Sequence, residues 1–191
     1  MKIKVLDKNE IEKIYKEHLI NDFPKDELKP LEYINKMHDL SKYECFGFYD
    51  KDLLVGYAYM VIPDDSDIRL LDYFAVIKEF RNNGIGGDCL KALNEYYKHL
   101  SCVILESEHP DYSKDDSDRK IRERRLEFYK RNGLIQTEIT TFVGGVYYTI
   151  FCMECSELID EIDIKSAIDK IYNTMFKVKK VPSSVRLWSI L

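Results

Sequence analysis

The 191-residue sequence lacks the features of exported and membrane-spanning proteins. Its first ten residues, MKIKVLDKNE, contain no apolar core of the kind that signal peptides carry. No run approaches the roughly 18 apolar residues that a membrane span requires. The net charge is −5 and basic clusters are few, which disfavours nucleic acid as a partner. We therefore expect a cytoplasmic protein that binds neither membranes nor nucleic acid.

Cysteine and histidine are too scattered to predict a metal site. The five cysteines include one C-x-x-C pair, Cys152 and Cys155, without a second pair or histidines at ligand spacing. An odd number of cysteines in a chain of this length, without an export signal, favours reduced thiols. We expect no bound metal and no disulfide.

The residue patterns predict an α+β fold. Apolar periodicity and turn signals give the element order βααβββαβαββ. Strand-like runs over residues 43–49, 53–62 and 70–76 form an antiparallel meander, because only short polar loops separate them. A helix between the strands at 70–76 and 102–106 indicates a parallel pair. One mixed, mostly antiparallel sheet of about six or seven strands accommodates this order.

The most informative stretch covers residues 70–93. A strand-like run is followed by a loop that contains Gly84, Gly86 and Gly87, and then by helical spacing. A helix N-terminus presents unpaired N–H groups and partial positive charge. Glycine lets the backbone approach an anion closely. We interpret this loop as a site for the pyrophosphate of a nucleotide-like cofactor.

Two common glycine-loop motifs do not fit this stretch. A Walker A loop requires Lys followed by Ser or Thr after the last glycine, whereas Asp88 and Cys89 follow Gly87. A dinucleotide-binding fingerprint requires a third glycine where Cys89 stands. The pattern that fits is R-x-x-G-x-G over residues 81–86.

This hexapeptide, RNNGIG, resembles the acetyl-coenzyme-A loop of the GNAT superfamily of N-acetyltransferases. The second signature of that superfamily, FY-x-x-x-G, is matched by FYKRNG over residues 128–133. The resemblance covers residues 1–155 and implies the GNAT fold for that domain. Apolar residues at helical spacing after it predict a C-terminal helical extension over 156–191, packed on the domain.

The resemblance implies an acetyl-CoA-dependent N-acetyltransferase. The amine of a small molecule or peptide would attack the thioester directly in a ternary complex. Loop N–H groups would hold the pyrophosphate with help from Arg81, Val76 N–H would polarise the thioester carbonyl, and Tyr129 would protonate the departing thiolate. The residues implied for cofactor binding are Phe74, Ala75, Val76, Arg81, Asn82, Asn83, Gly84, Ile85, Gly86 and Gly87.

The general base is left open by the sequence. Some family members carry a glutamate on the strand over 70–76, where this chain has only Asp72. A lysine-like amine, with a pKa of about 10.4, must lose a proton before it attacks. Glu106 and Glu108 share one face of the next strand by alternation. Glu106 is the first candidate for base or amine ligand, followed by Glu108 and Asp72.

Two other interpretations stay open. The chain is also compatible with a non-catalytic acyl-CoA-binding or regulatory module, or with a nucleotide-binding protein. The second signature helix has a cationic start, with Arg119, Arg122, Arg124 and Arg125. These arginines could reach a cofactor phosphate, but a solvated face with local ion pairs is favoured. The sequence allows a monomer or a homodimer.

Overall fold

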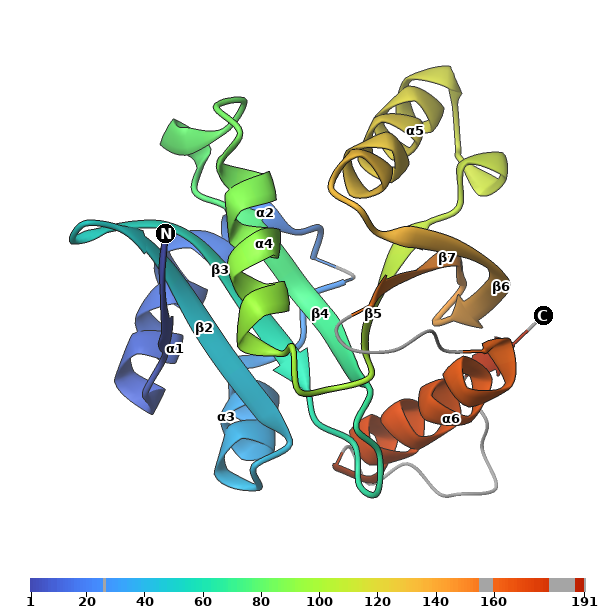
Figure 1. Cartoon of the computed structure of the whole chain (residues 1–191), viewed down its shortest axis with the longest axis horizontal. Coiled ribbons are helices and arrows are strands. Elements are labelled where there is room, and N and C mark those ends of the chain that lie inside the picture. The colour runs from blue at the N-terminus through green and yellow to red at the C-terminus, as the bar shows by residue number, and fades with distance from the viewer. Residues whose placement is uncertain (26, 155–159, 179–187, 191) are drawn as a thin grey trace.

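A computed structural model describes residues 1–25, 27–154, 160–178 and 188–190 (Figure 1). Within these ranges, eight strands form one mixed sheet in the order β1-β2-β3-β4-β5-β7-β6-β8. The predicted fold class is confirmed; the sheet has one strand more than expected because a short C-terminal strand pairs with β6. The strands are β1 (Lys2–Val5), β2 (Tyr43–Asp50), β3 (Leu53–Val61), β4 (Arg69–Val76), β5 (Cys102–Glu108), β6 (Ile135–Val143), β7 (Val146–Glu154) and β8 (Trp188–Ile190).

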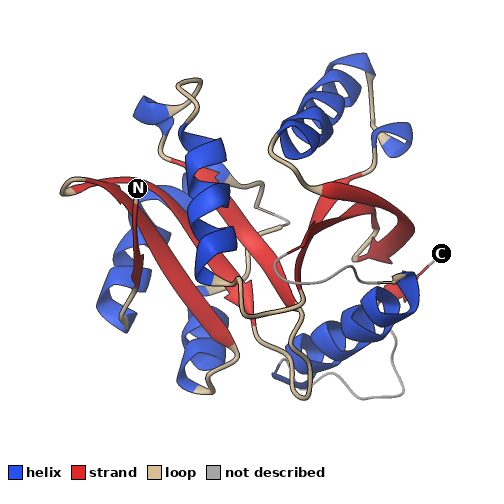
Figure 2. Ribbon diagram, in the orientation of Figure 1, coloured by secondary structure: helices blue, strands red, loops and turns tan. Residues whose placement is uncertain are grey.

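Helices cover both faces of the sheet (Figure 2). One face packs against α1, α3 and α6, and the other against α4 and α5, each around its own cluster of buried side chains. The helices are α1 (Lys8–Ile14), continued by a π turn (Tyr15–Leu19) and α2 (Ile20–Asp22), then α3 (Leu31–Asp39), α4 (Ile85–Tyr96), α5 (Asp116–Arg131) and α6 (Glu161–Val178). None of the helices described is long and apolar enough to cross a membrane.

Local sequence explains where the helices begin. Asp7 and Glu10 form a reciprocal capping box at the start of α1, which satisfies two backbone N–H groups. Asp115 accepts a hydrogen bond from the Asp118 N–H at the start of α5. Gly84, with a φ of 79°, precedes α4 in a left-handed conformation that favours glycine. The glycine loop therefore sets the direction in which α4 leaves the sheet.

The parallel contact between β4 and β5 is short. Only Arg69, Leu70 and Leu71 of β4 pair with β5, opposite Val103, Ile104 and Leu105. Beyond this point the two strands separate, as Figure 1 shows. β4 continues to pair with β3, and β5 with β7. The middle of the sheet is therefore open between the C-terminal ends of two neighbouring strands.

Part of the C-terminal extension predicted from the sequence lies within the described residues. α6 buries a stripe of apolar side chains in the same core cluster as α1 and α3. The Tyr33 hydroxyl of α3 donates a hydrogen bond to the Met175 carbonyl of α6, at 3.0 Å. Residues 156–159, 179–187 and 191 of the predicted extension lie outside the described residues. The boundary at 155 stays a prediction.

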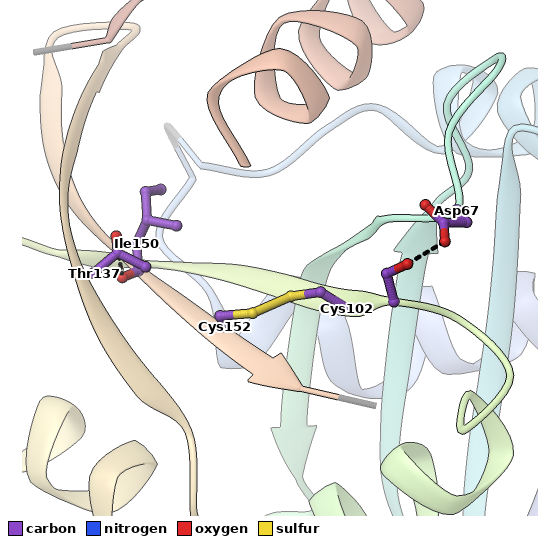
Figure 3. The surroundings of a disulfide bond; sticks show 6 residues. Asp67, Cys102, Thr137, Ile150 and Cys152 are labelled. Carbon is purple, nitrogen blue, oxygen red and sulfur yellow. Dashed lines mark hydrogen bonds between the residues drawn. A yellow bond between two sulfur atoms is a disulfide. The ribbon is translucent and has the colours of Figure 1, made fainter. Parts of the chain in front are cut away.

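The expectation of reduced thiols is wrong for two cysteines. The structure joins Cys102 of β5 and Cys152 of β7 as a disulfide (Figure 3). The register of β5 and β7 brings them together. Cys152 pairs directly with Ile104, and Cys102 lies diagonally across from Cys152, with 6.4 Å between the Cα atoms of the two cysteines. Cysteine counting does not reveal such a long-range neighbour. Cys155, the other member of the C-x-x-C pair, lies outside the described residues.

Replacement of Tyr33 by Phe tests how α6 is held on the domain. We expect Tyr33→Phe to lower the free energy of unfolding by about 1 kcal/mol, because the buried Met175 carbonyl loses its donor. Denaturant unfolding measures this, with Tyr112→Phe, whose side chain is exposed, as the control. Equal unfolding midpoints for wild type and Tyr33→Phe would show that this hydrogen bond does not stabilise the docked helix.

Candidate active site

A pocket of about 920 Å³ occupies the opening between β4 and β5. Its walls come from β4, the glycine loop, β5, α5, the β6–β7 hairpin and α6. Ten of the twelve residues predicted for the site line it: Phe74, Ala75, Val76, Arg81, Asn82, Gly84, Gly86, Gly87, Glu106 and Tyr129. Asn83 and Ile85 do not line it, and Ile85 instead packs against the core under α4.

The open edge of β4 faces this pocket. The Ile77 N–H donates to the Val55 carbonyl of β3, at 2.9 Å. Because successive peptide groups of a strand point in opposite directions, the Val76 N–H points away from β3 and toward the opening. The Val76 carbonyl lies on the same side, where it accepts a hydrogen bond from the Arg81 side chain. β4 therefore presents backbone hydrogen-bonding groups to anything bound in the pocket.

The glycine loop presents the beginning of α4 to the same pocket. Gly87 and Asp88 donate backbone hydrogen bonds to the Gly84 carbonyl, at 2.9 and 3.3 Å. The N–H groups that precede them, on Ile85 and Gly86, have no acceptor within the helix. Together with the helix dipole, these groups favour an anion at this end of the pocket.

Gly86 and Gly87 also allow α5 to approach the loop. A Cβ atom on Gly86 would lie 2.9 Å from the Phe128 ring, and one on Gly87 would lie 2.3 Å from Asn132 Oδ1. Phe128 and Asn132 belong to the second predicted signature, so the two motifs are in direct contact. The glycines are predicted from the sequence to bind an anion, and the structure adds this packing requirement.

Arg81 is not simply a solvated cation of the loop, because its guanidinium group has partners on two other elements. Its guanidinium contacts the carboxylate of Asp22, whose side chain is 11% exposed. Its Nε donates to the Val76 carbonyl, at 2.8 Å. Arg81 therefore ties the glycine loop to α2 and β4, and Asp22 competes with any bound anion for its charge.

Tyr129 lies on the buried side of α5, at the pocket wall. Its ring packs against Phe128 and Phe151, with centroid distances of 5.3 and 5.5 Å. Burial raises the pKa of the Tyr129 hydroxyl, and Arg125 opposes part of the rise. The hydroxyl is therefore protonated at neutral pH and is able to donate a proton or a hydrogen bond.

Glu106 lies on the other wall, on β5. Its Oε1 accepts hydrogen bonds from the Thr141 hydroxyl, at 2.7 Å, and from the Tyr172 hydroxyl. Burial raises the pKa of Glu106 above its ordinary value, while the two hydroxyls and Lys29 lower it and Asp72 raises it. A carboxylate with a raised pKa is a better proton acceptor than an ordinary glutamate, and this suits a general base.

The other two candidate carboxylates are occupied by cations. Glu108 forms ion pairs with Arg122, at 2.9 Å, and with Arg125, at 3.1 Å. Asp72 pairs with Lys29, at 2.7 Å, and also accepts a hydrogen bond from Tyr43. In the part of the chain that the structure describes, Glu106 is the one candidate base without an ion pair.

The prediction of a solvated arginine face is wrong for Arg122. Its side chain is 10% exposed and pairs with Glu108 and Asp118. It also donates to the His109 carbonyl, at 3.0 Å, because the turn after β5 folds over α5. Arg119 does follow the expectation, with exposed ion pairs to Asp111 and Glu123.

Sequence reasoning did not identify two residues that contact Glu106. Thr141 and Tyr172 are 35 and 66 residues away from it along the chain. The apolar stripe after residue 155 predicts a helix but does not show which strand it contacts. Among the described residues, no cluster of His, Cys, Asp and Glu is arranged to hold a metal ion.

Comparison with known proteins identifies the family of this chain. The model of the Acetyltransferase (GNAT) family matches residues 9–133, which is more than half of the chain. The chain therefore belongs to the GNAT acetyltransferase family. No curated protein matches the sequence significantly.

Solved structures of this family share the fold. A GNAT-family protein from Bacteroides thetaiotaomicron superposes with a TM-score of 0.69 at 22% identity, over 97% of this chain and 100% of that one. The ribosomal-protein-S18-alanine N-acetyltransferase from Escherichia coli gives 0.58 at 14%, over 84% and 97%. A GNAT acetyltransferase from Elizabethkingia anophelis with acetyl-CoA bound gives 0.56 at 19%, over 80% and 97%. At these identities the likeness establishes the fold alone.

A double-variant cycle tests the contact between the two motifs. We expect Gly87→Ala to lower the free energy of unfolding by about 1–2 kcal/mol, because the new methyl group would collide with Asn132. In an Asn132→Ala background the same change should be neutral or stabilising, since alanine has the higher helix propensity. Denaturant unfolding of the four proteins measures the coupling, and additive effects would contradict the contact.

Proposed function

We propose that this protein transfers the acetyl group of acetyl-CoA to a primary amine of a small molecule or peptide. The observation that carries the proposal is a single pocket that joins the N-terminus of α4, the free edge of β4, Tyr129 and Glu106. This supports the proposal, because the pocket would then bring an anion site, an open strand edge, a proton donor and a proton acceptor around one space. Each of these would assist direct acetyl transfer to an amine.

The residues present fit a CoA thioester. The N–H groups at the start of α4 suit its pyrophosphate, and Gly86 and Gly87 leave the backbone without side chains there. The edge of β4 over Phe74, Ala75 and Val76 offers backbone groups to an amide-containing arm such as pantetheine. When bound, acetyl-CoA supplies an activated acyl group. The Arg81–Asp22 pair lies beside this site, with the Arg81 side chain 43% exposed.

The Val76 N–H would stabilise the acyl oxygen during transfer, and Tyr129 would protonate the leaving thiolate. The Val76 N–H is fixed by the strand and points into the opening, so it can stabilise an oxyanion without rearranging. Tyr129 is protonated and lines the same pocket. A thiol has a pKa of about 8.5, so proton donation by Tyr129 accelerates departure without being indispensable.

Glu106 would receive the proton of the incoming ammonium group, directly or through a water molecule. It is partly accessible from the pocket and has no ion-pair partner in the described chain. Glu108 and Asp72 are less suitable, because each must first release a cation. An unpaired carboxylate in a partly buried site also attracts a cationic amine.

The lining of the pocket that contains Glu106 also includes Glu27 and a group of apolar and aromatic side chains. The apolar and aromatic residues come from the segment before α3, the β6–β7 hairpin and α6, namely Phe23, Leu28, Val143, Val146, Tyr148, Met175 and Phe176. The Lys29–Asp72 pair is also part of this lining. We therefore propose an acceptor that joins a primary amine to an apolar body, with the amine directed to Glu106.

Thiol release from acetyl-CoA in the presence of amines tests the proposed reaction. We expect turnover with at least one member of a panel of polyamines, amino acids, aminoglycosides and peptides. The control is CoA binding measured by calorimetry on the same protein. CoA binding without turnover on any amine would favour a non-catalytic CoA-binding module, and protection by ATP or NAD but not CoA would favour a nucleotide-binding protein.

Replacement of Glu106 by Gln tests the base. We expect Glu106→Gln to reduce kcat/KM by about 10²- to 10⁴-fold, the range for loss of a general base, with CoA affinity unchanged. Glu95→Gln, on the exposed side of α4, is the matched control. Activity of Glu106→Gln close to that of wild type would exclude Glu106 as the base.

Replacement of Tyr129 by Phe tests the proton donor. The variant keeps the ring packing against Phe151 and removes only the hydroxyl. We expect kcat to fall by about 10²-fold while KM for the amine changes little. A kcat equal to that of wild type would remove Tyr129 from the mechanism.

A further inference from the structure

The C-terminal helix α6 takes part in the pocket although it lies beyond the residues matched by the family model. The match ends at residue 133, whereas α6 covers Glu161–Val178. α6 packs on the face of the sheet that α1 and α3 also cover, and it contributes Tyr172, Met175 and Phe176 to the pocket lining. A segment outside the matched region thus borders the part of the pocket that contains Glu106.

Two hydroxyls hold the same oxygen of Glu106. Thr141 on β6 and Tyr172 on α6 both donate to Oε1. The described chain offers no hydrogen bond to the second oxygen, Oε2, and Glu106 is partly accessible from the pocket. Two donors on one oxygen fix the plane of the carboxylate and leave the other oxygen available to a bound molecule.

We propose that Tyr172 is a positioning residue, which together with Thr141 holds Glu106 as a carboxylate with Oε2 presented to the acceptor amine. This proposal rests on the function proposed above, in which Glu106 is the general base. Thr141 is fully buried and the Tyr172 side chain is nearly so. Neither hydroxyl can be replaced by solvent without a change in packing.

The other polar groups near Glu106 do not perform this task. Asp72 and Lys29 face it from β4 and the segment before α3, but they are paired with each other. Glu108 is on the same strand and is paired with Arg122 and Arg125. Tyr148 of β7 lines the pocket and is near enough for the charge of Glu106 to affect its titration. The two hydroxyl donors on Oε1 are the direct contacts.

Carbon-13 NMR of the glutamate carboxyls tests the hydrogen bond without requiring turnover, with Glu106→Gln to assign the resonance. We expect Tyr172→Phe and Thr141→Val each to raise the pKa of Glu106 by about one unit, because a donor to the charged form is lost. Tyr33→Phe is the matched control, because it removes a hydrogen bond to α6 but none to Glu106. An unchanged Glu106 pKa in both Tyr172→Phe and Thr141→Val would overturn the proposal.

The pH dependence of kcat/KM then tests whether positioning matters to the reaction. A base works only when deprotonated, so activity falls as the pH decreases through its pKa. In Tyr172→Phe we expect this acid limb to move about one unit to higher pH, with roughly tenfold less activity on the limb and a smaller loss above it. The Tyr33→Phe limb should coincide with that of wild type.

The outcomes separate this proposal from the proposed function. If wild type transfers acetyl groups and the acid limb of Tyr172→Phe does not move although the Glu106 pKa does, acetyl transfer stands and the positioning role is overturned. A loss of activity that is equal at every pH would also overturn it, because that is the effect of a structural defect. If wild type acetylates no amine, the proposed function fails, and with it the role of Tyr172 in acceptor activation.

Discussion

The parallel pairing of β4 with β5 ends after three residue pairs, and the site depends on this early separation. A longer register would close the sheet and saturate the backbone of β4 with hydrogen bonds to β5. Instead, the Val76 N–H faces an opening into which α4, α5 and α6 each direct part of their surface. The same opening leaves Glu106 on β5 partly accessible, although the four residues before it, Cys102–Leu105, and Ser107 after it are buried.

Close packing between α4 and α5 holds the two helices that border the opening in a defined relative position. Gly86 and Gly87 are in contact with Phe128 and Asn132, so the anion site and the helix that carries Tyr129 cannot shift independently. Asn132 is itself held by a hydrogen bond from its side chain to the Phe128 carbonyl, at 2.8 Å. The two sequence signatures thus form one packed unit, which contains both the proposed anion site and the proposed proton donor, Tyr129.

Much of this arrangement could be predicted from the sequence because it depends on local patterns. The element order follows from periodicity and turn signals, and the glycine loop and the FY signature predict where the cofactor binds. The contacts of Glu106 with Thr141 and Tyr172, and the pairing of Cys102 with Cys152, depend on register between segments distant in sequence. Local patterns in one sequence do not reveal that register. The sequence therefore ranked Glu106 before Glu108 and Asp72 but could not show that the last two are paired with cations.

A crystal structure of the protein with CoA tests the central claim most directly, namely that the opening between β4 and β5 is where the two substrates meet. We predict that the pyrophosphate lies on the N–H groups at the start of α4. The pantetheine arm should follow the edge of β4, with the sulfur between Tyr129 and Glu106 and near Val76. CoA bound elsewhere on the protein, with this opening empty, would contradict the account.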